Sequence, residues 1–104
     1  MIYIPRNWVM LKISSKEYGV FYKVLASWGD SWKLSSGTTS MEYTELGFKF
    51  PQISNSEYIC HRHCYGLSLY TANILHSFTK DLDGTDSTIE LLDEQTDWAS
   101  ITYA

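Results

Sequence analysis

Apolar and polar side chains alternate near the start of the chain, which is the pattern of β-strands. In 7–14 (NWVMLKIS), Val9, Leu11 and Ile13 fall on one face, whereas Trp8 and Met10 fall on the other. Since both faces carry apolar side chains, we expect this strand to be covered, at least in part, on both sides.

A second strand is predicted over 18–28 (YGVFYKVLASW), because this stretch is rich in β-branched and aromatic residues. Gly29 and Asp30 then fit a two-residue hairpin turn, where glycine tolerates a positive φ. That turn sets Leu25 opposite Leu34 and returns the chain over 31–36 (SWKLSS). Alternation divides the second strand into two faces: Tyr18, Val20, Tyr22, Val24 and Ala26 on one, and Phe21 and Leu25 on the other.

Two more strands are predicted in the middle of the chain, after a loop over 37–40 (GTTS). The first covers 41–50 (MEYTELGFKF); we expect it to bend at Gly47 and to end before Pro51. The second covers 57–64 (EYICHRHC).

The hydrophobic period changes from two residues to the helical value after Ser68, which is a suitable N-cap. Gly84 is a suitable helix stop, with Lys80 in the last turns. Beyond it, 87–92 (STIELL) predicts a sixth strand, 93–98 a turn or short helix, and 99–103 (ASITY) an end strand. The residues that share one face of the predicted helix are Tyr70, Thr71, Ile74, Leu75, Phe78 and Leu82.

Consecutive strands followed by one long helix predict an α+β fold. We expect a single domain over 1–104, with an antiparallel meander of about five to six strands packed against the one helix. One helix cannot cover both faces of such a sheet, so an aromatic face would stay open and would allow a homodimer.

The composition favours a folded domain, because 44% of the residues are hydrophobic and 15% are aromatic. No apolar run approaches the roughly 18 residues that span a bilayer, and the first residues lack the pattern of a secretory signal. Two cysteines without such a signal favour free thiols in a reducing compartment. We therefore expect a cytoplasmic protein that does not contact membranes.

The net charge of −4 conceals an asymmetry along the chain. Residues 1–80 hold all eight basic residues and only five acids, whereas 81–104 hold seven acids and no base. Such an asymmetry points to a partner, or it keeps an aromatic protein soluble; both interpretations stay open. The candidate contact surface consists of Asp83, Asp86, Glu90, Asp93, Glu94 and Asp97.

The stretch CHRHC over 60–64 holds both cysteines and two of the three histidines. On a strand, Cys60 and Cys64 would lie about 13 Å apart, too far to share one zinc ion. In a helical turn the cysteines would meet, but the histidines would point elsewhere. His61 and His63 could bind a metal only if a neighbouring element supplied a third ligand. We expect core-facing cysteines, and neither a metal nor another cofactor.

Motifs for catalysis are missing from the sequence. There is no phosphate-cradling glycine loop, no GxSxG and no HExxH, so we do not expect an enzyme or a catalytic residue. Trp28 and Trp32 flank the predicted hairpin turn, where they could stack on nucleic-acid bases with Lys33 on a phosphate, or simply pack the hairpin. Since the basic residues are spread singly, we expect no direct nucleic-acid binding, but both tryptophans stay candidate binding residues.

Three segments resemble small uncharacterised proteins of bacteriophages and prophages: YIPRNWVMLKI, YKVLASW and DSWKLSSG. The resemblance covers roughly the first 40 residues, with a weaker similarity in CYGLSLYTANI, and it carries over no site residue. It implies a short phage protein that binds and disables host machinery, CRISPR and restriction systems included.

The sequence therefore predicts a non-enzymatic inhibitor in the host cytoplasm, whose partner is a host protein complex with a basic surface. Its acidic C-terminal region would be the contact surface. The alternative is an oligomeric module that binds a small molecule or a metal, through the aromatic sheet face or through Cys60–Cys64.

Overall fold

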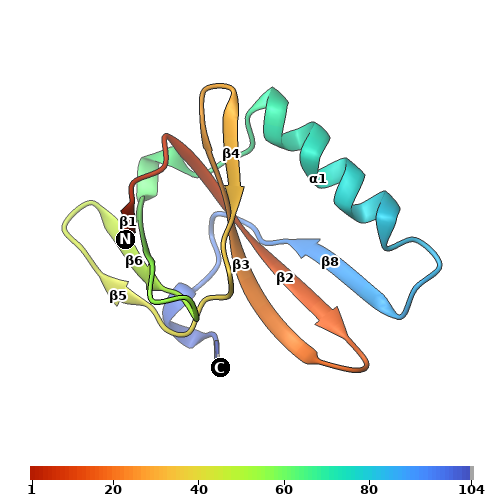
Figure 1. The fold of residues 1–104 in the computed structure, drawn as a ribbon. Helices are drawn as coiled ribbons and strands as arrows, with labels where there is room; N and C mark the ends of the chain where they lie inside the picture. The colour runs from red at the N-terminus through yellow and green to blue at the C-terminus, as the bar shows by residue number, and fades with distance from the viewer. Residues whose placement is uncertain (104) are drawn as a thin grey trace.

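The computed structural model describes residues 1–103, which form two four-stranded β-sheets and one α-helix (Figure 1). The β2 sheet has the strand order β4-β3-β2-β8, and the β7 sheet has the order β1-β7-β6-β5. The strands are β1 (Ile2–Tyr3), β2 (Asn7–Ser15), β3 (Gly19–Trp28), β4 (Ser31–Leu34), β5 (Glu42–Tyr43), β6 (Gly47–Pro51), β7 (Glu57–His61) and β8 (Ser87–Leu91). The helices are α1 (Leu69–Asp81) and the two 3₁₀ turns η1 (Arg62–Cys64) and η2 (Trp98–Ser100). The predicted α+β class is confirmed.

The β2 sheet follows the sequence pattern closely. β3 pairs antiparallel with β2 and with β4, and Leu25 lies opposite Leu34 as the predicted hairpin turn requires. Gly29 in that turn has φ +67°, a conformation that favours glycine. β8 pairs antiparallel with the other side of β2 and is an edge strand.

β2 is buried on both faces, as the alternation predicts. Trp8 and Met10 join the main core, whereas Val9 and Leu11 join a second core under α1. All four side chains are at most 1% exposed. The molecule therefore has three layers: the β7 sheet, the β2 sheet and α1.

The main core fills the space between the two sheets. β2 and β3 contribute one wall, and β6 and β7 contribute the other through Phe48, Phe50, Tyr58 and Cys60. Trp98 and Tyr103, from the end of the chain, close this core. The aromatic sheet face that we expected to be open is thus covered by a second sheet. It no longer gives a reason to expect a homodimer.

α1 begins where the sequence predicts. The Ser68 hydroxyl accepts a hydrogen bond from the Thr71 N–H, and the Ser68 N–H donates to the Thr71 hydroxyl, which forms a capping box. Ile74, Leu75 and Phe78 pack against the β2 sheet. Tyr70 was expected on this face, but it is 43% exposed and lies at its margin.

Three element boundaries differ from the expectations. The stretch 41–50 is not one bent strand; it forms the hairpin β5–β6, because the chain reverses at 44–46 and the Gly47 N–H donates to the Thr44 hydroxyl. The strand expected over 57–64 ends at His61, and η1 begins at the next residue, Arg62. The end strand expected over 99–103 is absent: η2 occupies its start, and Tyr103 turns into the core.

The meander expected as one sheet is divided into two sheets, and β1 pairs with β7 in parallel. The division falls in 35–41, where the chain leaves the β2 sheet. There the Ser35 hydroxyl accepts from the Val24 N–H, and Thr38 bonds to Gln52. Buried polar groups thus find partners at the crossing between the sheets.

At Gly47, the β5–β6 hairpin lies very close to the backbone at the end of β7. A Cβ atom at this position would lie 2.3 Å from the Cys60 carbonyl oxygen and 2.7 Å from the Arg62 nitrogen. Because both are backbone atoms, Gly47→Ala is expected to lower the free energy of unfolding by about 3 kcal/mol. The control is Gly19→Ala, where φ is +80° but nothing lies within 4 Å, so about 1 kcal/mol is expected. Urea denaturation measures both; equal losses would contradict this account.

Candidate functional site

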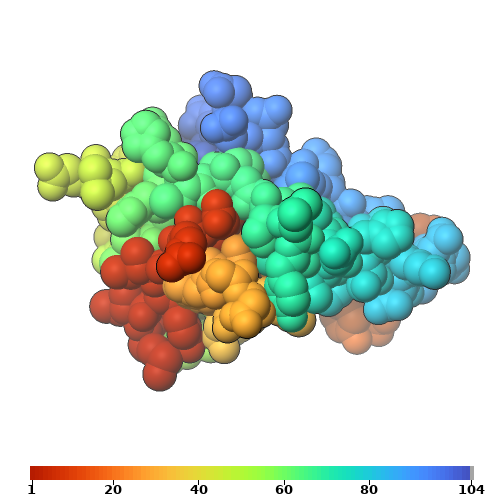
Figure 2. Space-filling model, turned by 90° about the horizontal axis from the view of Figure 1, so that it is seen from above, coloured from red at the N-terminus to blue at the C-terminus, as the bar shows by residue number. Residues whose placement is uncertain are grey.

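The six candidate carboxylates lie on the part of the chain between α1 and η2. Asp83 and Asp86 lie between α1 and β8, Glu90 lies on β8, and the other three lie on the segment after β8. All six residues are exposed. Figure 2 shows the chain after α1, in light and dark blue, along one margin of the molecule. We call Asp83, Asp86, Glu90, Asp93, Glu94 and Asp97 the acidic margin.

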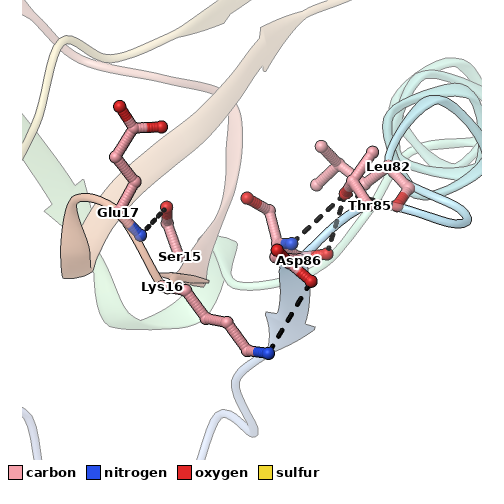
Figure 3. A network of polar contacts seen from close by, with 7 residues as sticks. Ser15, Lys16, Glu17, Leu82, Thr85 and Asp86 are labelled. Carbon is pink, nitrogen blue, oxygen red and sulfur yellow. Dashed lines mark hydrogen bonds and ion pairs between the residues drawn. The ribbon is translucent and has the colours of Figure 1, made fainter.

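Only one residue of the acidic margin forms an ion pair within 1–103. Asp86 lies 3.8 Å from the Lys16 ammonium, on the turn between β2 and β3 (Figure 3). Both side chains are largely exposed, so this pair adds little stability. By contrast, Lys49 in the β7 sheet lies 3.2 Å from both Glu42 and Glu57, and their hydrogen bonds raise its pKa. Acidic residues are thus paired in the β7 sheet and mostly unpaired at the acidic margin.

Two residues of the acidic margin also have local structural roles. The Asp93 carboxylate accepts a hydrogen bond from the Gln95 N–H at 2.7 Å, and Asp97 accepts from the Ala99 N–H as the N-cap of η2. The carboxylates of Asp83, Glu90 and Glu94 make no hydrogen bond or ion pair inside the described chain. No ion pair holds these three carboxylates, although Lys12 lies opposite Glu90 in the pairing of β2 with β8.

Trp28 and Trp32 are structural residues of the hairpin. The Trp28 indole donates a hydrogen bond to the Ile4 carbonyl at 2.9 Å and lies against Tyr3. Trp32 packs edge-on against Phe78 of α1, with ring centroids 5.7 Å apart. It holds the helix against the β2 sheet and retains 37% exposure. These contacts match the second interpretation of the tryptophans, in which they pack the hairpin.

The Cys-His stretch divides between β7 and η1. Cys60 is fully buried in the main core, and desolvation raises its pKa well above the usual value. Cys64 is half-buried at the edge of the same core. The His61 carbonyl accepts a hydrogen bond from the Trp8 indole at 2.8 Å, and His63 is exposed. The two cysteines are free thiols that face the core, as expected.

Metal ligands do not converge in the part of the chain that is described: no three His, Cys, Asp or Glu residues lie together in a way that could hold an ion. The third ligand that His61 and His63 would need is therefore not found there. Nor does the single long helix, α1, have the length and apolar character needed to cross a membrane.

A cleft of about 460 Å³ lies next to η1, and it was not predicted from the sequence. Arg62 and His63 of η1 line it, together with Glu94, Gln95 and Thr96 of the segment after β8. Its floor consists of Trp8, Phe48, Tyr65 and Trp98. The Arg62 guanidinium lies 5.1 Å from the centroid of the Phe48 ring. The lining residues come from segments far apart in sequence, so no local motif could predict the cleft.

Tyr65 fixes the position of the segment after β8 next to this cleft. Its hydroxyl donates to the Leu92 carbonyl, and its ring lies edge-on to Trp8. Desolvation raises the pKa of Tyr65 to about 12, so the hydroxyl stays a donor at neutral pH. Glu94 belongs both to the cleft and to the acidic margin.

Comparison of the chain with protein-family models, with curated protein sequences and with solved structures gave no match.

The two thiols are expected to differ in reactivity. In the native protein at pH 8, a thiol-specific disulfide reagent should react quickly with Cys64 and only after unfolding with Cys60, because Cys60 is buried and its pKa is raised. Cys64→Ala should remove the fast phase, and Cys60→Ala should keep it. Fast labelling of the Cys64→Ala variant under native conditions would show that β7 opens easily.

Proposed function

We propose that the protein is a non-enzymatic inhibitor that binds a host nucleic-acid-handling or defence complex, of the anti-CRISPR or anti-restriction type. The acidic margin is its contact surface, and a basic surface of the complex is its target. The observation that carries this proposal is that every carboxylate of the acidic margin is exposed while only Asp86 meets a cation of the described chain.

The physical basis is electrostatic complementarity. Exposed charges that lack internal partners set up a negative potential, which speeds association with a positive surface. A basic groove that normally holds a phosphate backbone offers closely spaced Lys and Arg side chains. Carboxylates on an ordered margin can occupy such a groove in place of the nucleic acid, and the complex cannot process them as a substrate. This function needs neither a catalytic constellation nor a cofactor.

The margin is ordered by the fold. Glu90 lies on β8, whose register against β2 is fixed from Leu91 to Ser87. Asp93 and Asp97 close local turns, and Trp98 anchors the following segment in the main core. Ordered charges lose little conformational entropy on binding, which favours affinity. This order supports a contact surface over a flexible solubility tail.

The test compares two triple variants. Asp83→Asn/Glu90→Gln/Glu94→Gln removes the three carboxylates of the margin that have no internal bond. Asp30→Asn/Glu17→Gln/Glu45→Gln removes the same residue types at exposed positions elsewhere. Both change the net charge equally and should fold normally. The wild type serves as bait in bacterial lysate at low and at high salt, and native mass spectrometry identifies what is retained.

A nucleic-acid-handling complex should be retained at low salt and released at high salt. The margin variant should bind it roughly tenfold or more weakly, if each rim charge contributes about 0.5 kcal/mol. The control variant should bind like the wild type. Equal affinity of the two variants for the captured complex would refute the acidic margin as the contact surface.

A further inference from the structure

A second cavity, of about 330 Å³, lies on the other side of the molecule, where the edges of the two sheets meet. Tyr3 and Tyr58 contribute from β1 and β7, and Lys33 and Leu34 contribute from β4. The remaining lining residues are four serines: Ser35, Ser36, Ser54 and Ser56. None of the lining residues is acidic, although the chain as a whole is.

The Tyr58 hydroxyl has no partner within the protein. Tyr58 is 1% exposed, yet its hydroxyl forms no hydrogen bond with residues 1–103, and its ring only stacks against Tyr3. Every side-chain nitrogen or oxygen that is sealed from solvent in this part of the chain does have a partner. The Tyr58 hydroxyl is therefore not sealed, and the space that it meets is the cavity that Tyr58 lines. Because the hydroxyl is open to this cavity, a ligand or a water molecule there can accept its proton.

The serines around it can donate hydrogen bonds. The Ser35 hydroxyl oxygen accepts from the Val24 N–H at 2.8 Å, which leaves its proton for a ligand. The Ser36 hydroxyl oxygen accepts from the Ser54 N–H, and its proton goes to the Ser54 hydroxyl at 2.9 Å. The hydroxyl proton of Ser54 is then left without an acceptor and can be donated to a ligand. Ser56 uses its backbone carbonyl for Gln52 and keeps its hydroxyl free.

Lys33 gives the cavity its charge. Its ammonium lies 5.3 Å from the centroid of the Tyr3 ring and pairs with no carboxylate of the described residues. Burial raises the pKa of Tyr58 to about 12, so its hydroxyl is protonated and donates at neutral pH. Hydroxyl protons and one ammonium without a carboxylate form a set of donors that suits an oxyanion.

We propose that this cavity binds a small phosphomonoester, with the phosphate between Lys33 and the Tyr58 hydroxyl and a hydroxyl-bearing remainder against the serines. The volume lies at the lower end of the roughly 300–1,000 Å³ of small-molecule sites, which limits the ligand to the size of a phosphorylated sugar. The four consecutive residues 33–36, at and after the end of β4, supply half of the lining. This site is separate from the acidic margin and does not depend on the function proposed for it.

The experiment titrates ribose 5-phosphate, inorganic phosphate and uncharged ribose into the ¹⁵N-labelled protein at low salt. Ribose 5-phosphate should cause saturable amide shifts at 33–36 and 54–58, inorganic phosphate weaker shifts at the same residues, and ribose none. Absence of saturable shifts with both phosphates at millimolar concentration, or equal binding of ribose, would overturn the proposal.

Two variants identify the groups that bind. Tyr58→Phe should weaken ribose 5-phosphate binding about tenfold to a hundredfold, because one hydrogen bond to a charged oxygen is lost. It should leave the urea midpoint unchanged, since that hydroxyl bonds to no protein group. Lys33→Met should abolish binding, whereas Lys23→Met, whose ammonium lies similarly over the Phe21 ring at 5.7 Å, should not. Unchanged affinity in Tyr58→Phe, or equal losses in the two lysine variants, would refute the assignment.

Discussion

The Trp8 indole is the contact on which the other parts of the structure depend. It is 1% exposed and packs against Phe48 and Phe50 of the β7 sheet, Tyr65 after η1, and Trp98 of η2. Its N–H donates to the His61 carbonyl at the point where β7 ends. One side chain of β2 therefore joins both sheets, the Cys-His stretch and the end of the chain. Aromatic pairs of this kind add about 0.5–1.5 kcal/mol each beyond the area that they bury.

The sequence predicted correctly those elements that depend on residues close together in the chain. Alternation in β2 and β3, the Gly29 turn and the Ser68 cap all follow from neighbouring residues, and each was confirmed. The β5–β6 hairpin was not predicted, because 41–50 was read as one strand bent at Gly47, whereas the chain reverses at 44–46 and the Gly47 N–H donates to the Thr44 hydroxyl. The second sheet was not predicted for a different reason. A sequence shows that a face is apolar, but not which element covers it.

The candidate sites divide in the same way. Charge is visible in sequence, so the acidic margin could be listed residue by residue, and the structure adds only which carboxylates lack partners. The two cavities are assembled from segments that no spacing connects: Arg62 and Glu94 both line one, and Lys33 and Tyr58 both line the other. In the second cavity, the decisive feature is that the Tyr58 hydroxyl has no hydrogen-bond partner in the protein, and this cannot be read from a sequence.

The position of Trp98 and Tyr103 has a consequence for how the molecule forms. Both complete the main core from the last residues of the chain, and β8 joins β2 from the opposite end of the sequence. The core thus cannot close until nearly the whole chain is present. Pairings between such distant segments cost loop entropy before they return contact energy. Its topology is that of β-rich domains, which typically fold in roughly milliseconds to seconds, and removing 98–103 would take two aromatic side chains out of its main core.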